Sequence, residues 1–226
     1  MNKFQPYVPL LEKALHRLDE WRSSFGYVPE RKSPDKRIEE ILADLGKKLE
    51  ENYPFHHPSY AGQMLKPPHP VAWLAYMLTM TVNPNNHALD GGPPTSAMEK
   101  EVVDKIAEMV GYQVGFLGHL TSAGTIANLE ALFVAREIRP GKAISATANG
   151  HYTHRRMSKV LNGPFMEIPV DENGIPDLNY IKKNISKIGT IVVTMGTTGL
   201  GYVEPLSQIL ELAEKHSVRV HVDAAY

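Results

Sequence analysis

The feature that most constrains the fold is an alternation of short apolar runs and helical segments in the second half of the chain. The apolar runs predict strands at 114–120, 143–147, 166–170, 188–195 and 218–223. Segments with helical character lie between them, at 125–139, 153–161, 178–187 and 204–216. Strands that alternate with helices favour a mostly parallel sheet with helices on both faces. We therefore expect an α/β fold for this part of the chain.

The N-terminal part has a different pattern. Two amphipathic helices are predicted at 8–24 and 35–52, followed by a Pro-rich irregular connection at 54–70. The apolar run at 71–82 has 12 residues, fewer than the ~20 that cross a bilayer, and predicts a buried helix. We expect a helical arm with a Pro-rich loop over 1–82 and the α/β part over 83–226.

One more helix is predicted at the start of the α/β part. It runs from Thr95 or Ser96 to Val110, and Gly111 ends it. Ser96 and Glu99 have the S-x-x-E spacing of a capping box, in which each side chain binds a free backbone N–H of the first turn. This spacing predicts that the helix begins at Ser96.

Composition excludes several functional classes. The 24 Lys and Arg residues balance 25 Asp and Glu residues, so the chain lacks the basic excess that nucleic-acid binding needs. Cysteine is absent, which excludes disulfides, thiolate nucleophiles and Cys-bound zinc from these residues. The N-terminus shows no apolar segment of the secretory type, and we expect a cytoplasmic protein without a membrane partner.

The segment Thr121-Ser-Ala-Gly-Thr125 joins a predicted strand to a predicted helix. Small residues allow an anion to approach the backbone, and the free N–H groups of a helix N-terminus favour negative charge there. This pattern indicates a phosphate site. An ordinary strand-to-helix turn with Thr125 as the N-cap is the alternative.

A carboxylate stands at the end of the last predicted strand. Side chains alternate along a strand, so Asp223 shares one face with His221 and Ala225. Open α/β sheets bind ligands at the edge formed by the C-terminal ends of their parallel strands, which is where Asp223 is predicted to lie. A buried carboxylate at that edge needs a cationic partner such as a protonated ring nitrogen. The alternative is that Asp223 caps a following turn.

Two further loops follow predicted strands and should open on the same edge of the sheet. One is the glycine-rich segment 196–201, GTTGLG, and the other is 149–154, NGHYTH, which contains His151. A histidine in a loop is more often a surface residue than a ligand. The meeting of four such segments at one edge favours a binding site.

These segments also resemble a known family. TSAGTIANLEAL, the His151 segment, MGTTG and HVDAAY, in this order and spacing, resemble the pyridoxal-phosphate-dependent group II amino-acid decarboxylases. The resemblance runs from about His57 to Tyr226, and HPSYAGQM with NPNN is similar to the bacterial tyrosine and glutamate decarboxylases. It implies the large domain of a fold-type I pyridoxal-phosphate-dependent transferase, with pyridoxal 5'-phosphate as the cofactor.

The resemblance implies how the cofactor would be held. Gly124 and Thr125 match residues that bind its phosphate. His151 matches the imidazole on one face of its ring, and Ala225 matches the small residue on the other face. Asp223 matches the carboxylate that pairs with the ring nitrogen, where it maintains the proton that makes the ring an electron acceptor.

The remaining implied roles concern the substrate and catalysis. Thr198 matches a threonine beside the ring substituents, and Gln63 and Met64 match a segment that lines the substrate entrance. His151 and Asp223 are the implied catalytic residues, with His151 as ring cover and proton donor. The absence of cysteine ligands and of an H-E-x-x-H motif leaves no predicted metal site.

The family implies decarboxylation of an aromatic or acidic L-amino acid by a homodimer. Its cofactor-binding lysine follows the HVDAAY strand, so the chain is expected to be the N-terminal part of an enzyme. Two alternatives remain open at this point. One is a lyase or aminotransferase on the same fold, and the other is a truncated, non-catalytic binding or dimerisation module.

Overall fold

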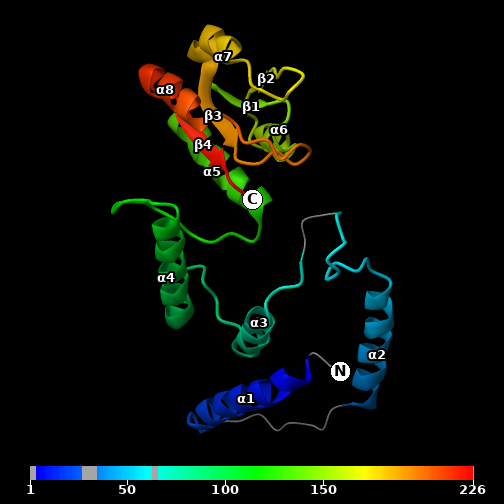
Figure 1. The fold of residues 1–226 in the computed structure, drawn as a ribbon. Helices are drawn as coiled ribbons and strands as arrows, with labels where there is room; N and C mark the ends of the chain where they lie inside the picture. The colour runs from blue at the N-terminus through cyan, green and yellow to red at the C-terminus, as the bar shows by residue number, and fades with distance from the viewer. Residues whose placement is uncertain (1–3, 27–34, 63–65, 226) are drawn as a thin grey trace. The chain divides into compact units, whose positions relative to one another are not determined.

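The computed structural model describes residues 4–26, 35–62 and 66–225 of the chain. These residues form two compact units, Met1–Met98 and Glu99–Tyr226, and the boundary falls within helix α4, Pro93–Met109. Figure 1 shows the order of the elements along the chain. In the described ranges, no helix combines the length and apolar character needed to cross a membrane.

The first unit is helical. It contains the short 3-10 helix η1, Gln5–Tyr7, and the helices α1, Val8–Ser23, α2, Lys36–Glu50, and α3, Pro70–Val82. The predicted helices at 8–24 and 35–52 are thus confirmed. Edge-on contacts of Phe4 and Tyr7 with the ring of Trp73 join η1 to α3, with ring centroids 6.1 and 6.0 Å apart.

The apolar sides of the first unit's helices are not enclosed. On α2 the predicted stripe is exposed, and it consists of Ile38, Ile41, Leu42, Leu45 and Leu49. Helix α3 is present as predicted, but the expectation that it is buried is wrong, since Tyr76 and Met80 are exposed. Among the described residues, α3 packs chiefly along α1 and η1, which cover only part of its surface.

The second unit is built on a parallel sheet with strand order β2-β1-β3-β4. Its strands are β1, Ala143–Thr147, β2, Phe165–Ile168, β3, Ile188–Thr194, and β4, Arg219–Asp223. The helices are α5, Gly124–Ile138, α6, Thr153–Val160, α7, Leu178–Asn184, and α8, Leu206–His216, with the 3-10 helix η2, Ile185–Lys187, after α7. The predicted α/β architecture is confirmed.

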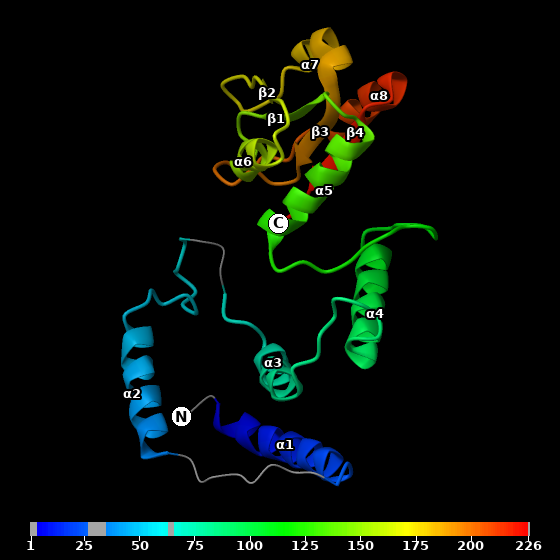
Figure 2. The ribbon, with the colours of Figure 1, turned by 180° about the vertical axis from the view of Figure 1, so that it is seen from behind.

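Residues of β3 divide between two hydrophobic cores because its side chains alternate. Val192 belongs to a core with Leu132 of α5 and Met157 of α6. Ile191 and Val193 belong to the opposite core, which includes residues of α7 and α8. Helices therefore cover both faces of the sheet, as the two views in Figures 1 and 2 show.

The predicted strand at 114–120 is wrong. This segment is irregular, and Val114 and Leu117 are fully exposed. A strand needs a neighbour to satisfy its backbone groups, and no described strand pairs with this segment. An apolar run is therefore insufficient evidence for a strand.

The predicted start of α4 is also wrong. The helix begins at Pro93, so Ser96 lies inside it. Proline suits a first helical turn because its φ is already helical and its missing N–H would have no partner there. Glu99 Oε1 accepts a hydrogen bond from Leu120 N at 2.9 Å, which ties the helix to the segment before α5.

The sheet core predicts a clear stability difference. Ile191 is fully buried in the central strand β3, whereas Ile138 at the end of α5 is half exposed. Ile191→Ala should lower the free energy of unfolding by about 2–5 kcal/mol, because it leaves a cavity. Ile138→Ala should change it by less than about 0.5 kcal/mol. Urea unfolding measures both, and equal losses would contradict the assigned core.

Candidate functional site

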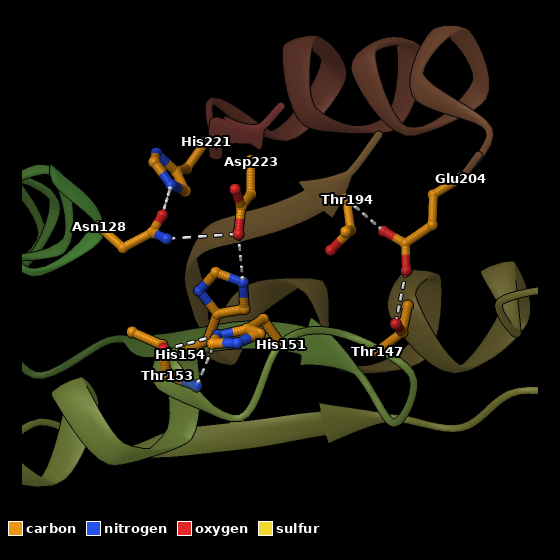
Figure 3. A network of polar contacts seen from close by, with 9 residues as sticks. All are labelled: Asn128, Thr147, His151, Thr153, His154, Thr194, Glu204, His221 and Asp223. Carbon is orange, nitrogen blue, oxygen red and sulfur yellow. Dashed lines mark hydrogen bonds and ion pairs between the residues drawn. The ribbon is translucent and has the colours of Figure 1, made fainter. Parts of the chain in front are cut away.

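The candidate site lies at the edge of the sheet where the strands end. Asp223 is the last residue of β4, Thr194 ends β3 and Thr147 ends β1. The N-terminal part of α5 reaches the same edge, because Asn128 contacts both Asp223 and His221 of β4. Figure 3 shows this network of side chains. Open parallel sheets bind ligands at this edge.

The start of α5 offers two free donors. Helix α5 begins at Gly124, and its N-cap residue, Ala123, has no side-chain bond. Ala123 O accepts hydrogen bonds from Ile126 N and Ala127 N, while the N–H groups of Gly124 and Thr125 have no partner among the described residues. A Cβ at Gly124 would meet nothing within 4 Å. Gly124 and Thr125 are both exposed, and free N–H groups at an exposed helix N-terminus favour an anion.

The start of α5 also tests the alternative for segment 121–125, which is an ordinary strand-to-helix turn with Thr125 as the N-cap. Thr125 does not act as the N-cap, because it is the second residue of the helix and the cap position belongs to Ala123. A plain strand-to-helix turn is excluded as well, since the preceding residues form no strand. The predicted phosphate site therefore depends on the N-terminus of α5 and its unpaired backbone N–H groups.

Asp223 is held by two side chains through one of its oxygens. Oδ2 accepts a hydrogen bond from Asn128 Nδ2 at 3.3 Å and lies 3.1 Å from His154 Nε2. The His154 ring is not aligned for a regular hydrogen bond, so we interpret this contact as mainly electrostatic. Oδ1 has no partner among the described residues.

These contacts keep Asp223 ionised. The contact with His154 lowers the pKa of Asp223, and burial opposes that shift without reversing it. The side chain is only 11% exposed, so little water competes for the carboxylate. Asp223 therefore presents a negative charge with one unshared oxygen, the form that a cationic ring nitrogen would pair with.

His221 supports this arrangement from the same strand. Its Nε2 lies 2.6 Å from Asn128 Oδ1, and burial lowers the pKa of His221 to about 4. The ring is therefore neutral near pH 7. Because the Asn128 amide nitrogen faces Asp223, its oxygen faces His221, which must carry its proton on Nε2 and donate it. The contacts from His221 through Asn128 to Asp223 are thus all satisfied by one set of proton positions.

His151 lies in the loop after β1, and its ring is half-buried. Its Nδ1 lies 2.6 Å from Thr153 Oγ1, and its ring packs on that of Tyr152 with centroids 4.3 Å apart. Thr153 N also donates to Nδ1, at 3.4 Å, which favours the proton on Nε2. The ring is thereby fixed at the sheet edge with one donor free.

Other predicted site residues are less closely associated with this network. Thr198 is exposed, whereas the preceding Thr197 is buried and closes the glycine-rich loop through hydrogen bonds with Tyr202. Ala225 is exposed just beyond β4. Gln63 and Met64 lie outside the described residues.

A second buried carboxylate connects the strand ends. Glu204 Oε1 accepts from Thr147 Oγ1 at 2.5 Å, and Oε2 accepts from Thr194 N at 2.7 Å. Burial raises the pKa of Glu204 above its ordinary value of 4.5. Glu204 therefore ties the ends of β1 and β3 to the segment before α8.

The site includes residues that the sequence analysis did not select, namely Asn128, His154 and Glu204. Asn128 follows Thr125 by three residues, and His154 follows His151 by the same spacing. On a helix this spacing places side chains on one face, which was an available signal for Asn128. No signal in the sequence marked Glu204, because a single acidic residue before a helix is common.

Comparison with known proteins decides the family. The family model described as "Pyridoxal-dependent decarboxylase conserved domain" matches residues 28–226. The chain belongs to this family. The cofactor of this family is pyridoxal phosphate, and the resemblance stated from the sequence is confirmed.

Curated relatives are amino-acid decarboxylases. The chain is 30% identical over 204 residues to the L-aspartate decarboxylase of Thermococcus kodakarensis, a match that covers 88% of this chain and 51% of that protein. It is 24% identical over 213 residues to the L-2,4-diaminobutyrate decarboxylase of Acinetobacter baumannii, covering 79% of this chain and 42% of that protein. The chain thus spans about half the length of the curated relatives it matches.

Solved structures show the same fold. The glutamate decarboxylase domain of a Vibrio parahaemolyticus transaminase and decarboxylase superposes with a TM-score of 0.76 at 19% identity, covering 100% of this chain and 57% of that one. Mouse CSAD gives a TM-score of 0.75 at 23% identity, covering 95% of this chain and 47% of that one. The fold is that of fold-type I pyridoxal-phosphate enzymes.

The described residues fit this cofactor by their chemistry. Its anionic phosphate matches the unpaired N–H groups of Gly124 and Thr125, next to open space. Its ring nitrogen, when protonated, matches the ionised Asp223, whose Oδ1 is unshared. Asn128 joins these two features, because it follows Thr125 by one helical turn and contacts Asp223.

The buried Glu204 predicts a pH-dependent stability. A raised folded-state pKa favours the protonated form, so its contribution is full below pH 4.5 and is lost as pH rises through the folded pKa. Relative to Glu204→Gln, which cannot ionise, the wild type should lose stability as pH rises above about 4.5. Urea unfolding between about pH 4 and pH 8 measures the difference.

The exposed Glu214 of α8 supplies the control. Glu214→Gln should show no such pH-dependent difference from the wild type, since this side chain is exposed in the folded chain and is not buried as Glu204 is. A pH-independent difference for Glu204→Gln would contradict the assigned effect of burial.

Proposed function

We propose that the complete protein containing this chain is a pyridoxal-phosphate-dependent α-decarboxylase of an L-amino acid. It would release CO2 and the corresponding amine. The observation that carries the proposal is the ionised Asp223, held at the sheet edge by Asn128 and His154 with Oδ1 unshared. Family membership supports the same activity.

In the proposed mechanism, the residues of this chain bind the cofactor and orient it. When bound, pyridoxal phosphate supplies an electron-accepting ring for the charge left at Cα as CO2 departs. The N–H groups of Gly124 and Thr125, which have no partner among the described residues, would hold the phosphate, and the ionised Asp223 would maintain the proton on the ring nitrogen. These two contacts would fix the plane of the ring, relative to which the breaking bond must be oriented.

His151, Ala225 and Thr198 complete the proposed site. The His151 ring would cover one face of the cofactor, and its free Nε2–H would serve as a donor. Ala225, a small residue just beyond Asp223, would lie on the opposite face. Thr198 would lie beside the ring substituents, and Gln63 with Met64 would line the substrate entrance.

The proposed substrate is an acidic or aromatic L-amino acid. The acidic class is supported by the relative named L-aspartate decarboxylase. Both classes are supported by a Methanopyrus kandleri protein named "Probable L-tyrosine/L-aspartate decarboxylase", 29% identical over 182 residues, a match that covers 79% of this chain and 48% of that protein. Product analysis separates decarboxylation from the alternative of a lyase or aminotransferase on the same fold. Decarboxylation yields CO2 and an amine, whereas a lyase or aminotransferase yields an aldehyde or a keto acid.

We further propose that the complete protein is a cytoplasmic homodimer. The exposed apolar stripe of α2 supports an interface between copies, because an apolar face of this kind gains free energy when it is covered. A cytoplasmic location fits an enzyme that acts on free amino acids.

Replacing Asp223 tests the activity. In the complete protein, Asp223→Ala should lower kcat/KM by about 10²- to 10³-fold, because it removes a preorganised charge next to the reacting system. The amine produced from candidate amino acids measures this loss. Circular dichroism should show a retained fold, since Asp223 lies at a strand end and not in either hydrophobic core.

Asp104→Ala is the matched control, because Asp104 is an exposed carboxylate on α4. It should leave kcat/KM and cofactor absorbance unchanged. Near-normal turnover by Asp223→Ala would refute the role of Asp223. A complete wild-type protein without visible cofactor absorbance or amine production would favour the non-catalytic alternative.

A further inference from the structure

His154 is the most deeply buried histidine of the candidate site. Its side chain is 1% exposed, although it lies in the first turn of α6, close to the surface edge of the sheet. The helix is fixed by Met157, whose side chain belongs to the hydrophobic core with Leu132 and Val192. The ring therefore has little freedom to leave its place beside Asp223.

Neither nitrogen of this ring makes a hydrogen bond of regular geometry to the described residues, but only one of them lies beside Asp223. Nε2 lies 3.1 Å from Asp223 Oδ2, whereas Nδ1 is buried with no partner among the described residues. An unpaired buried polar atom is destabilising, so a histidine with a purely structural role would be expected to pair both nitrogens. This ring instead makes its one polar contact to the carboxylate of the site.

Two acidic side chains interact with His154. Asp223 approaches from β4, and Glu204, from the segment before α8, also interacts electrostatically with His154. His221 of β4 faces it edge-on, with ring centroids 6.4 Å apart, and this ring is neutral near pH 7. A donor at Nε2 is therefore favoured on this side of Asp223.

The geometry points to His154 as a positioning residue, which occupies Oδ2 of Asp223 so that Oδ1 is the oxygen left for the ring nitrogen of the cofactor. Asn128 Nδ2 donates a hydrogen bond of 3.3 Å to the same oxygen, and a bond of this length leaves the carboxylate freer to rotate if His154 is absent. The inference rests on the proposed function, and it assigns the choice of oxygen to a residue that does not contact the cofactor.

A cofactor analogue distinguishes positioning from a structural role. The complete protein would be titrated with pyridoxal 5'-phosphate and with its 1-deaza analogue, in which carbon replaces the ring nitrogen. The ratio of the two dissociation constants reports the interaction of Asp223 with that nitrogen. Wild-type protein should prefer the natural cofactor by about tenfold or more, as expected for a charge-assisted hydrogen bond.

Replacement of His154 should reduce this ratio. His154→Phe retains a ring but removes the donor, and the ratio should fall to about two or three. His154→Gln places an amide nitrogen near the position of Nε2 and should restore most of it. His154→Asn carries the same amide group on a shorter side chain, so it should resemble His154→Phe, and it replaces that variant if the latter does not fold.

The outcomes are separable. A ratio unchanged from wild type in His154→Phe or His154→Asn, with both dissociation constants raised equally, would show a structural role and overturn the inference. A low ratio in His154→Gln would overturn it as well. If wild-type protein fails to prefer the natural cofactor, or Asp223→Ala leaves the preference intact, then it is the proposed role of Asp223 that fails.

Discussion

The candidate site depends on one electrostatic constraint, which is the burial of the Asp223 carboxylate at the end of a parallel strand. A buried charge is tolerated only with partners, and Asn128 and His154 supply them on one oxygen. Both partners come from the N-terminal parts of α5 and α6, two helices that cover the same face of the sheet. The position of this one charge therefore depends on strand β4 and on two helices at once.

The rest of the second unit holds β4, α5 and α6 in their relative positions. Parallel pairing of β1, β3 and β4 brings their carboxyl ends to one edge, and the two hydrophobic cores fix the helices on both faces. Glu204 adds a polar tie between the ends of β1 and β3. The N–H groups of Gly124 and Thr125, unpaired among the described residues, lie about one helical turn from Asn128, so the proposed anion site and the carboxylate form parts of one arrangement.

The sequence predicted the sheet because each strand from residue 143 onward is a short apolar run between helices. It failed at 114–120, where apolar residues lack a pairing strand, since pairing is a property of the fold and not of the run itself. Asp223 was selected from the sequence because a carboxylate at the end of a predicted strand is conspicuous. His154 was not, because its burial and its contact with β4, 69 residues later, depend on how α6 packs.

The central claim is that Asp223 holds a proton on the ring nitrogen of the cofactor, and nitrogen NMR tests it most directly. The measurement is the chemical shift of the ring nitrogen in ¹⁵N-labelled pyridoxal phosphate bound to the complete protein, followed across pH. The account predicts a pyridinium-type shift that persists well above neutral pH. A neutral pyridine-type shift at pH 7 would contradict it.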